Sequence, residues 1–306
     1  MCSLCVQSSD LSNHRRSAPN ASQVRTNSTI LWVFFAAMRT VGWLSFAALL
    51  TTTGCVVRPL EQVPPGVASF SVASYNVFFE RTSSRTIDAI ADLDADIVCM
   101  QETTPEWNAR FAERLSAQYP YVQAAPGQYA DGLTVLSKFP VRDAIRLTPD
   151  GTDGWLQARS FVADTPIGPV QILVVHLRPL INYGSKIIGY FTVQRVHERE
   201  VMKYLKSLRP DLPTLIVGDF NEGNGGRAIS ALEGHCYRDA LPEFDHDSPT
   251  WHGRVFKLPM TARLDHVLYT PATLHCYRAS VEKVGESDHW PVVATFGSVG
   301  TTDEHR

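Results

Sequence analysis

Two polar residues directly after a hydrophobic strand pattern are the strongest indication of chemistry in this 306-residue sequence. The segment LIVGDFNEG is apolar as far as Gly218 and then presents Asp219 and Asn221. In an extended chain these two side chains lie on the same side, so a carboxylate and an amide could together hold a phosphate group and a water or metal ion. Considered alone, such a pair after a strand more often stabilises a turn.

A second acidic residue, Glu102, follows the hydrophobic segment DIVCMQ. Mg²⁺ is usually held by one or two protein carboxylates and several waters, so a single Glu at the rim of a pocket is an adequate ligand. Considered alone, Glu102 is better explained as a solvated acid in a loop or at the start of a helix near Pro105.

Three further segments place histidines and acids beside apolar strands. Asp288 and His289 precede the pattern PVVATF, and because adjacent side chains diverge, we expect them to have different roles. Asp265, in RLDHVLYT, could accept a hydrogen bond from a distant imidazole and fix its tautomer. His176 follows the apolar run VQILVV. Considered alone, each histidine is better explained as a structural residue than as a catalytic one.

The elements that must position these residues alternate between short strands and amphipathic helices. Patterns rich in β-branched and aromatic residues predict strands at 70–79, 95–100, 133–141, 170–177, 214–220, 264–270 and 292–296. Apolar residues at helical spacing predict helices at 83–93, 105–119 and 191–208. This mixture predicts two sheets packed face to face with helices outside.

The order of the motifs resembles the endonuclease/exonuclease/phosphatase superfamily, which includes pancreatic-type deoxyribonuclease, exonuclease III, neutral sphingomyelinases and inositol polyphosphate 5-phosphatases. The motifs run SYNV, QE, VHL, GDFN, RLDHV and SDHWPV, and the resemblance spans Ser69 to Phe296. GDFN followed by SDHWPV is a specific combination. The resemblance implies an α/β fold, a four-layered α/β sandwich in which two mixed β-sheets pack face to face with helices outside.

The resemblance also implies a Mg²⁺ or Mn²⁺ cofactor and a role for particular residues. Asn76 and Glu102 match the metal-binding end of the family's site, and Asp288 is a further candidate metal ligand. The family's catalytic positions correspond here to five residues, namely His176, Asp219, Asn221, Asp265 and His289.

Two positions depart from the patterns of relatives. Val175 stands where Thr or Asn is common before the central His176, which removes a supporting hydrogen bond. Phe78 stands where abasic-site endonucleases have a carboxylate that assists the metal, and His176 stands where they have Tyr. Abasic-site repair is therefore not favoured.

The implied reaction is hydrolysis of a phosphodiester by in-line attack of an activated water. The metal would be held by Glu102 and would stabilise charge on the phosphoryl oxygens. Asp219 and His289, the latter oriented by Asp265, would position or deprotonate the water. The amide of Asn221 and the imidazole of His176 would donate hydrogen bonds to the phosphoryl oxygens.

Several alternatives stay open for the substrate. It could be a lipid headgroup, extracellular DNA or RNA, or a small phosphodiester, and no protein partner is inferred. A non-catalytic binding module that retains the fold is the alternative of another class. The apolar and aromatic segment 179–191 (PLINYGSKIIGYF) is predicted to be a packed loop, with a lip that meets lipid as the alternative.

The N-terminal part predicts a targeting segment. Residues 38–55 (MRTVGWLSFAALLTTTGC) have Arg39, a short apolar stretch and small residues before Cys55, which is the architecture of a signal peptide. The closing TTGC resembles a bacterial lipobox, so we expect lipidation of Cys55 and a catalytic domain anchored to the membrane of the bacterial cell envelope, outside the cytoplasm. The alternatives are an uncleaved helix from about Ile30 to Val57 and an ordinary secretory signal.

The chain thus divides into five predicted parts. Residues 1–37 are disordered or precede a true start at Met38, residues 38–55 are the signal peptide or anchor, and residues 56–68 are a Pro-containing tether. Residues 69–298 are the catalytic domain and residues 299–306 a tail.

The net charge bears on binding to nucleic acid, and the cysteines bear on the core and on the compartment. The net charge is −3, and residues 1–68 contain five Arg and two acidic residues, so the remainder is more acidic than the whole. A protein held to duplex DNA mainly by phosphate contacts would be basic. Cys99 lies in an apolar run and is predicted to be in the core. A disulfide between Cys236 and Cys276 would be compatible with an oxidising compartment.

Overall fold

The computed structural model describes residues 57–148, 157–179, 186–255 and 257–300. These residues belong to one compact unit, Val56–Arg306. The predicted signal peptide or anchor with Cys55, and the segment before it, lie outside the described residues. Within the described ranges, no helix is long and apolar enough to cross a membrane.

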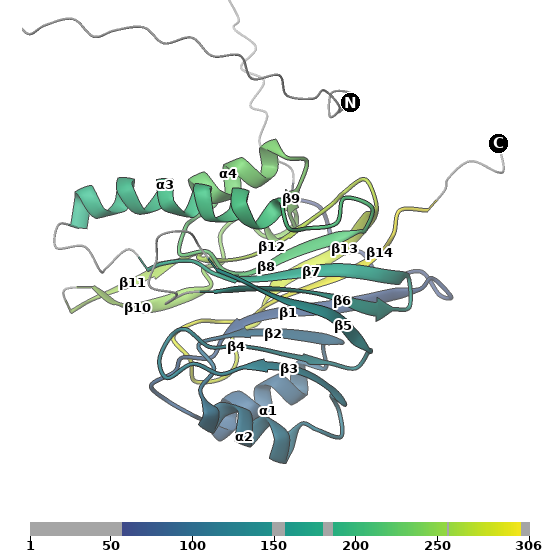
Figure 1. The fold of residues 1–306 in the computed structure, drawn as a ribbon, viewed down its shortest axis with the longest axis horizontal. Helices are drawn as coiled ribbons and strands as arrows, with labels where there is room; N and C mark the ends of the chain where they lie inside the picture. Colours follow the sequence, from purple (N-terminus) through teal and green to yellow (C-terminus); the bar gives the residue numbers. More distant parts are fainter. Residues whose placement is uncertain (1–56, 149–156, 180–185, 256, 301–306) are drawn as a thin grey trace, which may run out of the picture. The chain divides into compact units, whose positions relative to one another are not determined.

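Two six-stranded mixed sheets pack face to face (Figure 1). The first has the order β13-β14-β1-β2-β4-β3 and the second the order β5-β6-β7-β8-β12-β9. The strands of the first sheet are β1 (Ser69–Asn76), β2 (Ile97–Gln101), β3 (Tyr121–Ala125), β4 (Leu133–Ser137), β13 (Leu274–Val281) and β14 (Val292–Ser298). Those of the second are β5 (Val141–Leu147), β6 (Ala158–Thr165), β7 (Gly168–His176), β8 (Thr214–Asp219), β9 (Arg238–Asp239) and β12 (Asp265–Tyr269). A separate ribbon consists of β10 (Trp251–Val255) and β11 (Leu258–Ala262).

The layer between the two sheets is the largest hydrophobic core. Because side chains alternate along a strand, every second residue of a central strand points into this layer. Val72 on β1 and Val217 on β8 are examples, and both are fully buried. Asn76 continues the inward row of β1, and Asp219 continues that of β8. Both polar side chains therefore lie at one end of the apolar layer.

Helices cover the outer face of each sheet, which completes a four-layered α/β sandwich (Figure 1). The helices are α1 (Ser84–Leu93), α2 (Pro105–Arg114), α3 (Lys186–Leu205), α4 (Arg227–Gly234) and the one-turn α5 (Leu241–Phe244). Ile90 of α1 and Trp107 of α2 pack on the first sheet, and Tyr204 of α3 and Ile229 of α4 pack on the second. The predicted fold class is therefore confirmed.

Some local predictions were wrong. Residues 186–191, predicted to belong to a packed loop, form the start of α3, whereas residues 180–185 lie outside the described ranges. The helix predicted over 105–119 ends at Arg114. Cys99 is buried in the core as predicted, and the disulfide that the sequence left open between Cys236 and Cys276 is not formed.

The segment predicted as a tether is attached to the domain over part of its length. Arg58 donates hydrogen bonds to the side chain and main chain of Glu243, and the Glu61 amide donates to the Tyr277 carbonyl. His275 pairs with the carboxylate of Glu61 at 3.1 Å. These contacts order residues 58–61 against α5 and β13.

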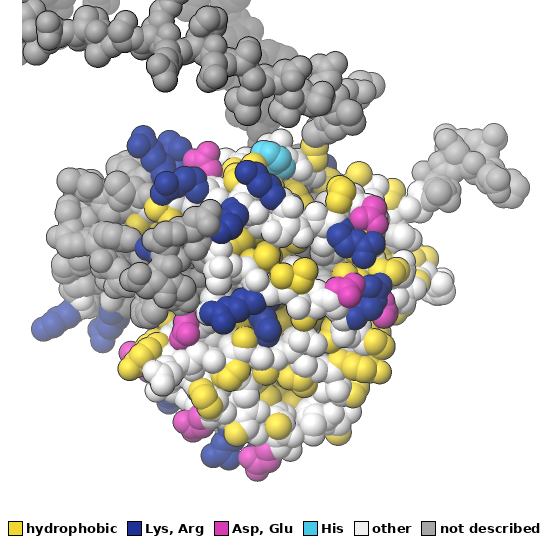
Figure 2. Space-filling view, in the orientation of Figure 1, with side chains coloured by type: hydrophobic (Ala, Val, Ile, Leu, Met, Phe, Trp, Pro, Cys, Tyr) yellow, Lys and Arg dark blue, Asp and Glu magenta, His cyan; other side chains and the backbone are white. Residues whose placement is uncertain are grey.

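One face of the domain carries mixed charge (Figure 2). On the face shown in Figure 2, Lys and Arg side chains are interspersed with Asp and Glu and with hydrophobic side chains. This face is therefore not the continuous basic surface that binding of duplex DNA through its phosphates would favour.

Candidate active site

Three adjacent strands of the second sheet place polar residues in one row. In the register of β7, β8 and β12, Asp219 pairs with His176 on one side and with Asp265 on the other. Paired residues of neighbouring strands point to the same face, so all three side chains lie at the end of the inner layer. Gly218 precedes Asp219 with φ 147°, and a Cβ there would lie 1.9 Å from the Val175 carbonyl oxygen. Only glycine allows this close approach of β8 to β7.

The carboxylate of Asp219 is the point on which the site converges. Its Oδ2 accepts a hydrogen bond from Asn76 Nδ2 at 3.1 Å and lies 3.7 Å from His176 Nε2 and 3.6 Å from His289 Nε2. Asp219 is 1% exposed. Side chains from three separate segments thus surround one buried carboxylate oxygen.

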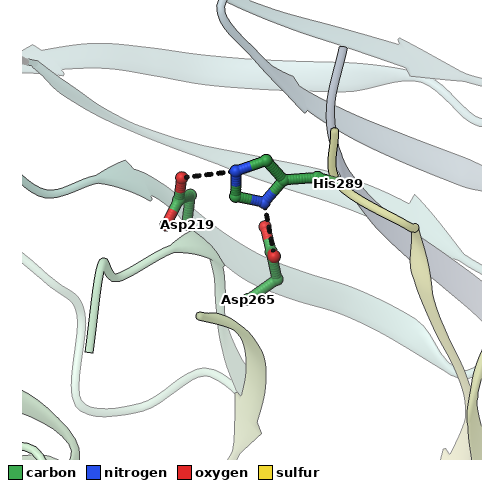
Figure 3. Close-up of side chains that lie close together, drawn as sticks. All are labelled: Asp219, Asp265 and His289. Atoms are coloured by element: carbon green, nitrogen blue, oxygen red, sulfur yellow. Dashed lines mark hydrogen bonds and ion pairs between the residues drawn. The ribbon is translucent and has the colours of Figure 1, made fainter. Parts of the chain in front are cut away.

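His289 forms the predicted pair with Asp265 (Figure 3). Its Nδ1 donates to Asp265 Oδ2 at 2.7 Å. Burial alone would lower the pKa of His289, but the charges of Asp265 and Asp219 outweigh burial and raise this pKa to about 10. Burial also raises the pKa of Asp265, yet the shared proton belongs on the imidazole because two carboxylates flank it. At neutral pH His289 is therefore an imidazolium that directs Nε2–H toward Asp219.

Glu102 lies on the other side of Asn76. The Asn76 amide also donates to Glu102 Oε1 at 3.1 Å, so one amide bridges the carboxylates of Glu102 and Asp219. Glu102 has φ 61°, an uncommon conformation for a residue with a side chain, and its Oε2 accepts the Phe79 amide at 3.1 Å. Burial raises the pKa of Glu102 in spite of the nearby His176.

This donor set fits a hard divalent cation. Within the described residues, the ion-pair partners of Glu102 and Asp219 are histidines and not Lys or Arg. Carboxylate oxygens that are not paired with Lys or Arg are the ligands that Mg²⁺ or Mn²⁺ takes. Atoms of Asp219, Asp265 and His289 also lie within 4.8 Å of one another, but there the imidazole is already bonded to Asp265. The Glu102 end therefore fits a metal better.

The orientation of His176 comes from a main-chain contact. Its Nδ1 lies 2.9 Å from the Ala130 carbonyl oxygen, which can only accept, so the proton is on Nδ1 and Nε2 faces the two carboxylates. The Ala130 carbonyl thus provides His176 with a supporting hydrogen bond, which the side chain of Val175 cannot form. The sequence contains no signal for it, because any residue at position 130 has a carbonyl.

Asn221 lies beyond the end of β8. β8 ends at Asp219, Asn221 has φ 49°, and its amide N–H donates to Asp219 Oδ1 at 2.8 Å. The Asn221 side chain donates to the Leu177 carbonyl at 2.8 Å. The extended geometry assumed for these two residues is therefore wrong, because the segment is a turn as well as part of the site.

Asp288 and His289 diverge as predicted. The Asp288 carboxylate accepts from the Trp251 indole at 3.0 Å, on the side of the β10–β11 ribbon. Ser287 donates to the Asn76 carbonyl at 2.6 Å and accepts the His289 amide at 3.1 Å, which fixes this segment against β1. Asp288 is thus tied to the ribbon, and the contributions of Trp251 and Ser287 were not foreseen from the sequence.

The fold and the site define a class of protein that acts on phosphoesters. The Endonuclease/Exonuclease/phosphatase family matches residues 73–289, and this chain belongs to that family. Members of the family are hydrolases of phosphoester bonds. No curated protein matches the chain.

Solved structures with the same fold differ widely in sequence. An endonuclease/exonuclease/phosphatase from Beutenbergia cavernae DSM 12333 is 19% identical with a TM-score of 0.63, over 76% of this chain and 72% of that one. The human Nocturnin catalytic domain with bound sulfate is 15% identical with a TM-score of 0.60, over 76% and 94%. D. rerio TDP2 complexed with single strand DNA product is 16% identical with a TM-score of 0.58, over 75% and 99%. These similarities establish the fold.

Proposed function

We propose that this chain is a Mg²⁺- or Mn²⁺-dependent phosphodiesterase that hydrolyses its substrate by in-line attack of an activated water. The observation that carries the proposal is the surroundings of Asp219 Oδ2, where an amide and two imidazoles lie within 3.7 Å. Phosphodiester hydrolysis needs a proton acceptor for the water and donors for the phosphoryl oxygens, and these groups supply both.

The protonation states assign the roles. His289 is cationic, so its Nε2–H donates to a phosphoryl oxygen whose negative charge grows during attack. Asp265 holds the proton on the opposite nitrogen and keeps the ring oriented. Asp219 is the carboxylate left to orient the water and accept its proton.

Glu102, with Asn76 beside it, would hold the metal, and Asp288 would approach from the ribbon side. A divalent cation bound there supplies charge stabilisation for the phosphoryl oxygens and the leaving group. Asn221 is oriented by Leu177 next to this region and serves as a further donor to the phosphate.

The substrate class proposed is a phosphodiester outside the cytoplasm, reached by a domain anchored through Cys55. The sequence of residues 38–55 supports this location. Extracellular DNA or RNA is a second candidate substrate, favoured by the single strand DNA product bound to the similar D. rerio TDP2. Lipid headgroups and small phosphodiesters are the remaining candidate substrates.

Hydrolysis of bis(p-nitrophenyl) phosphate by the purified full chain tests the activity. We expect p-nitrophenolate release with Mg²⁺ or Mn²⁺, loss with a chelator, and recovery when metal is restored. His289→Ala should abolish it, whereas Glu113→Gln, on the exposed surface of α2, should not. No hydrolysis with any divalent metal would instead support a non-catalytic binding module.

A substrate panel then separates the candidate classes. Nucleic acids, sphingomyelin and phosphoinositides are compared under the conditions that hydrolyse the generic diester. Hydrolysis of p-nitrophenyl phosphate in preference to the diester would contradict the assignment as a phosphodiesterase.

A further inference from the structure

A buried threonine joins the two segments that carry the Asp265–His289 pair. Thr250 directly precedes β10 and is fully buried. Its hydroxyl oxygen accepts the amide N–H groups of Leu264 at 2.9 Å and Asp265 at 3.0 Å. Its carbonyl oxygen accepts the amide of Trp290, the residue after His289, at 2.6 Å. One residue therefore holds the main chain on both sides of the pair.

The hydroxyl of Thr250 also has a proton to donate. Its oxygen accepts two N–H groups, so its own hydrogen needs an acceptor. Asp265 Oδ2 is bonded to His289, whereas Oδ1 is buried and has no hydrogen bond within the described part of the chain. The described hydrogen bonds of the Thr250 hydroxyl are to the main chain, so Thr250 acts on Asp265 by holding its amide N–H.

We propose that Thr250 is a positioning residue that sets Asp265 against His289. The kinetic consequence of this role rests on the proposed phosphodiesterase activity, whereas its structural consequence does not. Thr250 is fully buried and acts through Asp265, so losing its hydroxyl should lower kcat with little change in KM.

Two substitutions isolate the hydroxyl. Thr250→Val keeps the volume and removes the hydroxyl, and Thr250→Ser keeps the hydroxyl. Thr214→Val is the matched control, because Thr214 is buried at the opposite end of β8 from Asp219 and its hydroxyl donates to the Leu212 carbonyl.

With bis(p-nitrophenyl) phosphate, kcat of Thr250→Val should fall about 10–100-fold, the usual effect of losing a group that orients a functional residue. Thr250→Ser should stay close to the wild type. Thr214→Val should lower the melting temperature without lowering kcat. An equal loss of kcat in both valine variants, measured well below their melting temperatures, would show that Thr250 only stabilises the fold.

A spectroscopic readout tests the proposal without turnover. The strong His289–Asp265 hydrogen bond should give a low-field imidazole N–H proton resonance, assigned by its absence in His289→Ala. The resonance should persist in Thr250→Ser and Thr214→Val and should shift or vanish in Thr250→Val. An unchanged resonance in a folded Thr250→Val variant refutes the positioning role, whether or not the protein hydrolyses any phosphodiester. Failure of the wild type to hydrolyse diesters refutes only the proposed activity.

Discussion

The proton shared between Asp265 and His289 gives His289 a role distinct from that of His176. Both histidines direct Nε2 toward Asp219, but the Nδ1 of His289 faces the Asp265 carboxylate, which makes His289 cationic, whereas the Nδ1 of His176 faces a main-chain carbonyl. One imidazole therefore brings a positive charge to the phosphate, and the other brings a nitrogen whose position is fixed by the main chain. Two identical side chains acquire different chemistry because their partners differ.

Asp265 and His289 should act as one unit. Asp265→Asn and His289→Ala should each lower kcat by roughly 10²–10⁴, because either change disrupts the same hydrogen-bonded pair that presents Nε2–H to the phosphate. The double variant should be scarcely slower than the slower single variant. Measuring kcat and melting temperature for the whole cycle checks this. Additive losses, or losses explained by unfolding, would contradict the pairing.

Glu102 should matter for metal more than for folding. Its carboxylate is a proposed metal ligand, and an amide of the same size keeps an oxygen at the site but removes the charge that attracts a cation. Glu102→Gln should lower activity by about 100-fold or more and raise the Mg²⁺ concentration needed for half-maximal rate. Titration with Mg²⁺ measures both effects. Wild-type activity and metal dependence would remove Glu102 from the site.

The sequence could predict the acids and histidines of the site but not the groups that orient them. Asp265 and His289 were paired through the resemblance of their motifs, and the hydrogen bond is present. Thr250, Trp251 and Ala130 act through a hydroxyl, an indole and a carbonyl that reach residues distant in the chain. Contacts of this kind depend on tertiary packing, which leaves no periodic pattern in the sequence.

At the scale of elements, an unbroken apolar run decided which strands could be predicted. The central strands β7, β8 and β12 are buried on both faces, so they appear in the sequence as apolar runs. The edge strands β3 and β5 are mostly exposed and carry no such run, and both were missed. Strands β6 and β13 are largely buried, but polar residues interrupt their apolar runs, and they were missed as well. The start of α3 was missed because Gly189 and two aromatic residues obscure the helical spacing.

A buried hydrogen bond between His197 and Glu222 ties α3 and α4 to the loop that carries Asn221. Glu222 accepts from His197 Nδ1 at 2.9 Å and from the Ala228 amide at 2.8 Å, and neither side chain of the pair is exposed. The His197 Nε2 in turn donates to the Arg178 carbonyl at 2.8 Å. The residues after β7 and β8 are thus held by one carboxylate.

Glu222→Gln should therefore destabilise the domain. Replacing the carboxylate weakens buried hydrogen bonds from His197 and from the Ala228 amide, and it lowers the free energy of unfolding by about 1–3 kcal/mol. Glu113→Gln, which breaks an exposed pair with Arg110, should cost less than about 1 kcal/mol. Urea denaturation followed by circular dichroism compares the two. Similar small losses would show that the buried pair is not needed for stability.

At the scale of the whole molecule, the proposed anchor and the mixed charge of the face in Figure 2 affect how the domain would encounter its substrate. A domain held at a membrane meets its substrates at high local concentration and does not need a basic surface to collect them. The ordered contacts of Arg58 and Glu61 leave only a few residues between Cys55 and the domain. The anchor would therefore keep the domain close to the lipid surface.

Lipidation of Cys55 can be tested directly. The full chain produced in a bacterium should incorporate radiolabelled palmitate, and Cys55→Ser should abolish the label. Cys5→Ser, which changes a cysteine upstream of Met38, should leave the label unchanged. Label that survives in Cys55→Ser, or a mature protein with an intact N-terminus, would argue against this attachment.

The alignment of β7, β8 and β12 has an evolutionary consequence. His176, Asp219 and Asp265 face one another because three strands are in register, and a slip of one residue would turn the row to the opposite face. Natural selection on such a row constrains the lengths of the strands and the few residues at their ends, while the apolar residues behind them can exchange for one another. Proteins that are only 15–19% identical to this chain accordingly share its fold. Insertions should accumulate in the loops and be rare within these three strands.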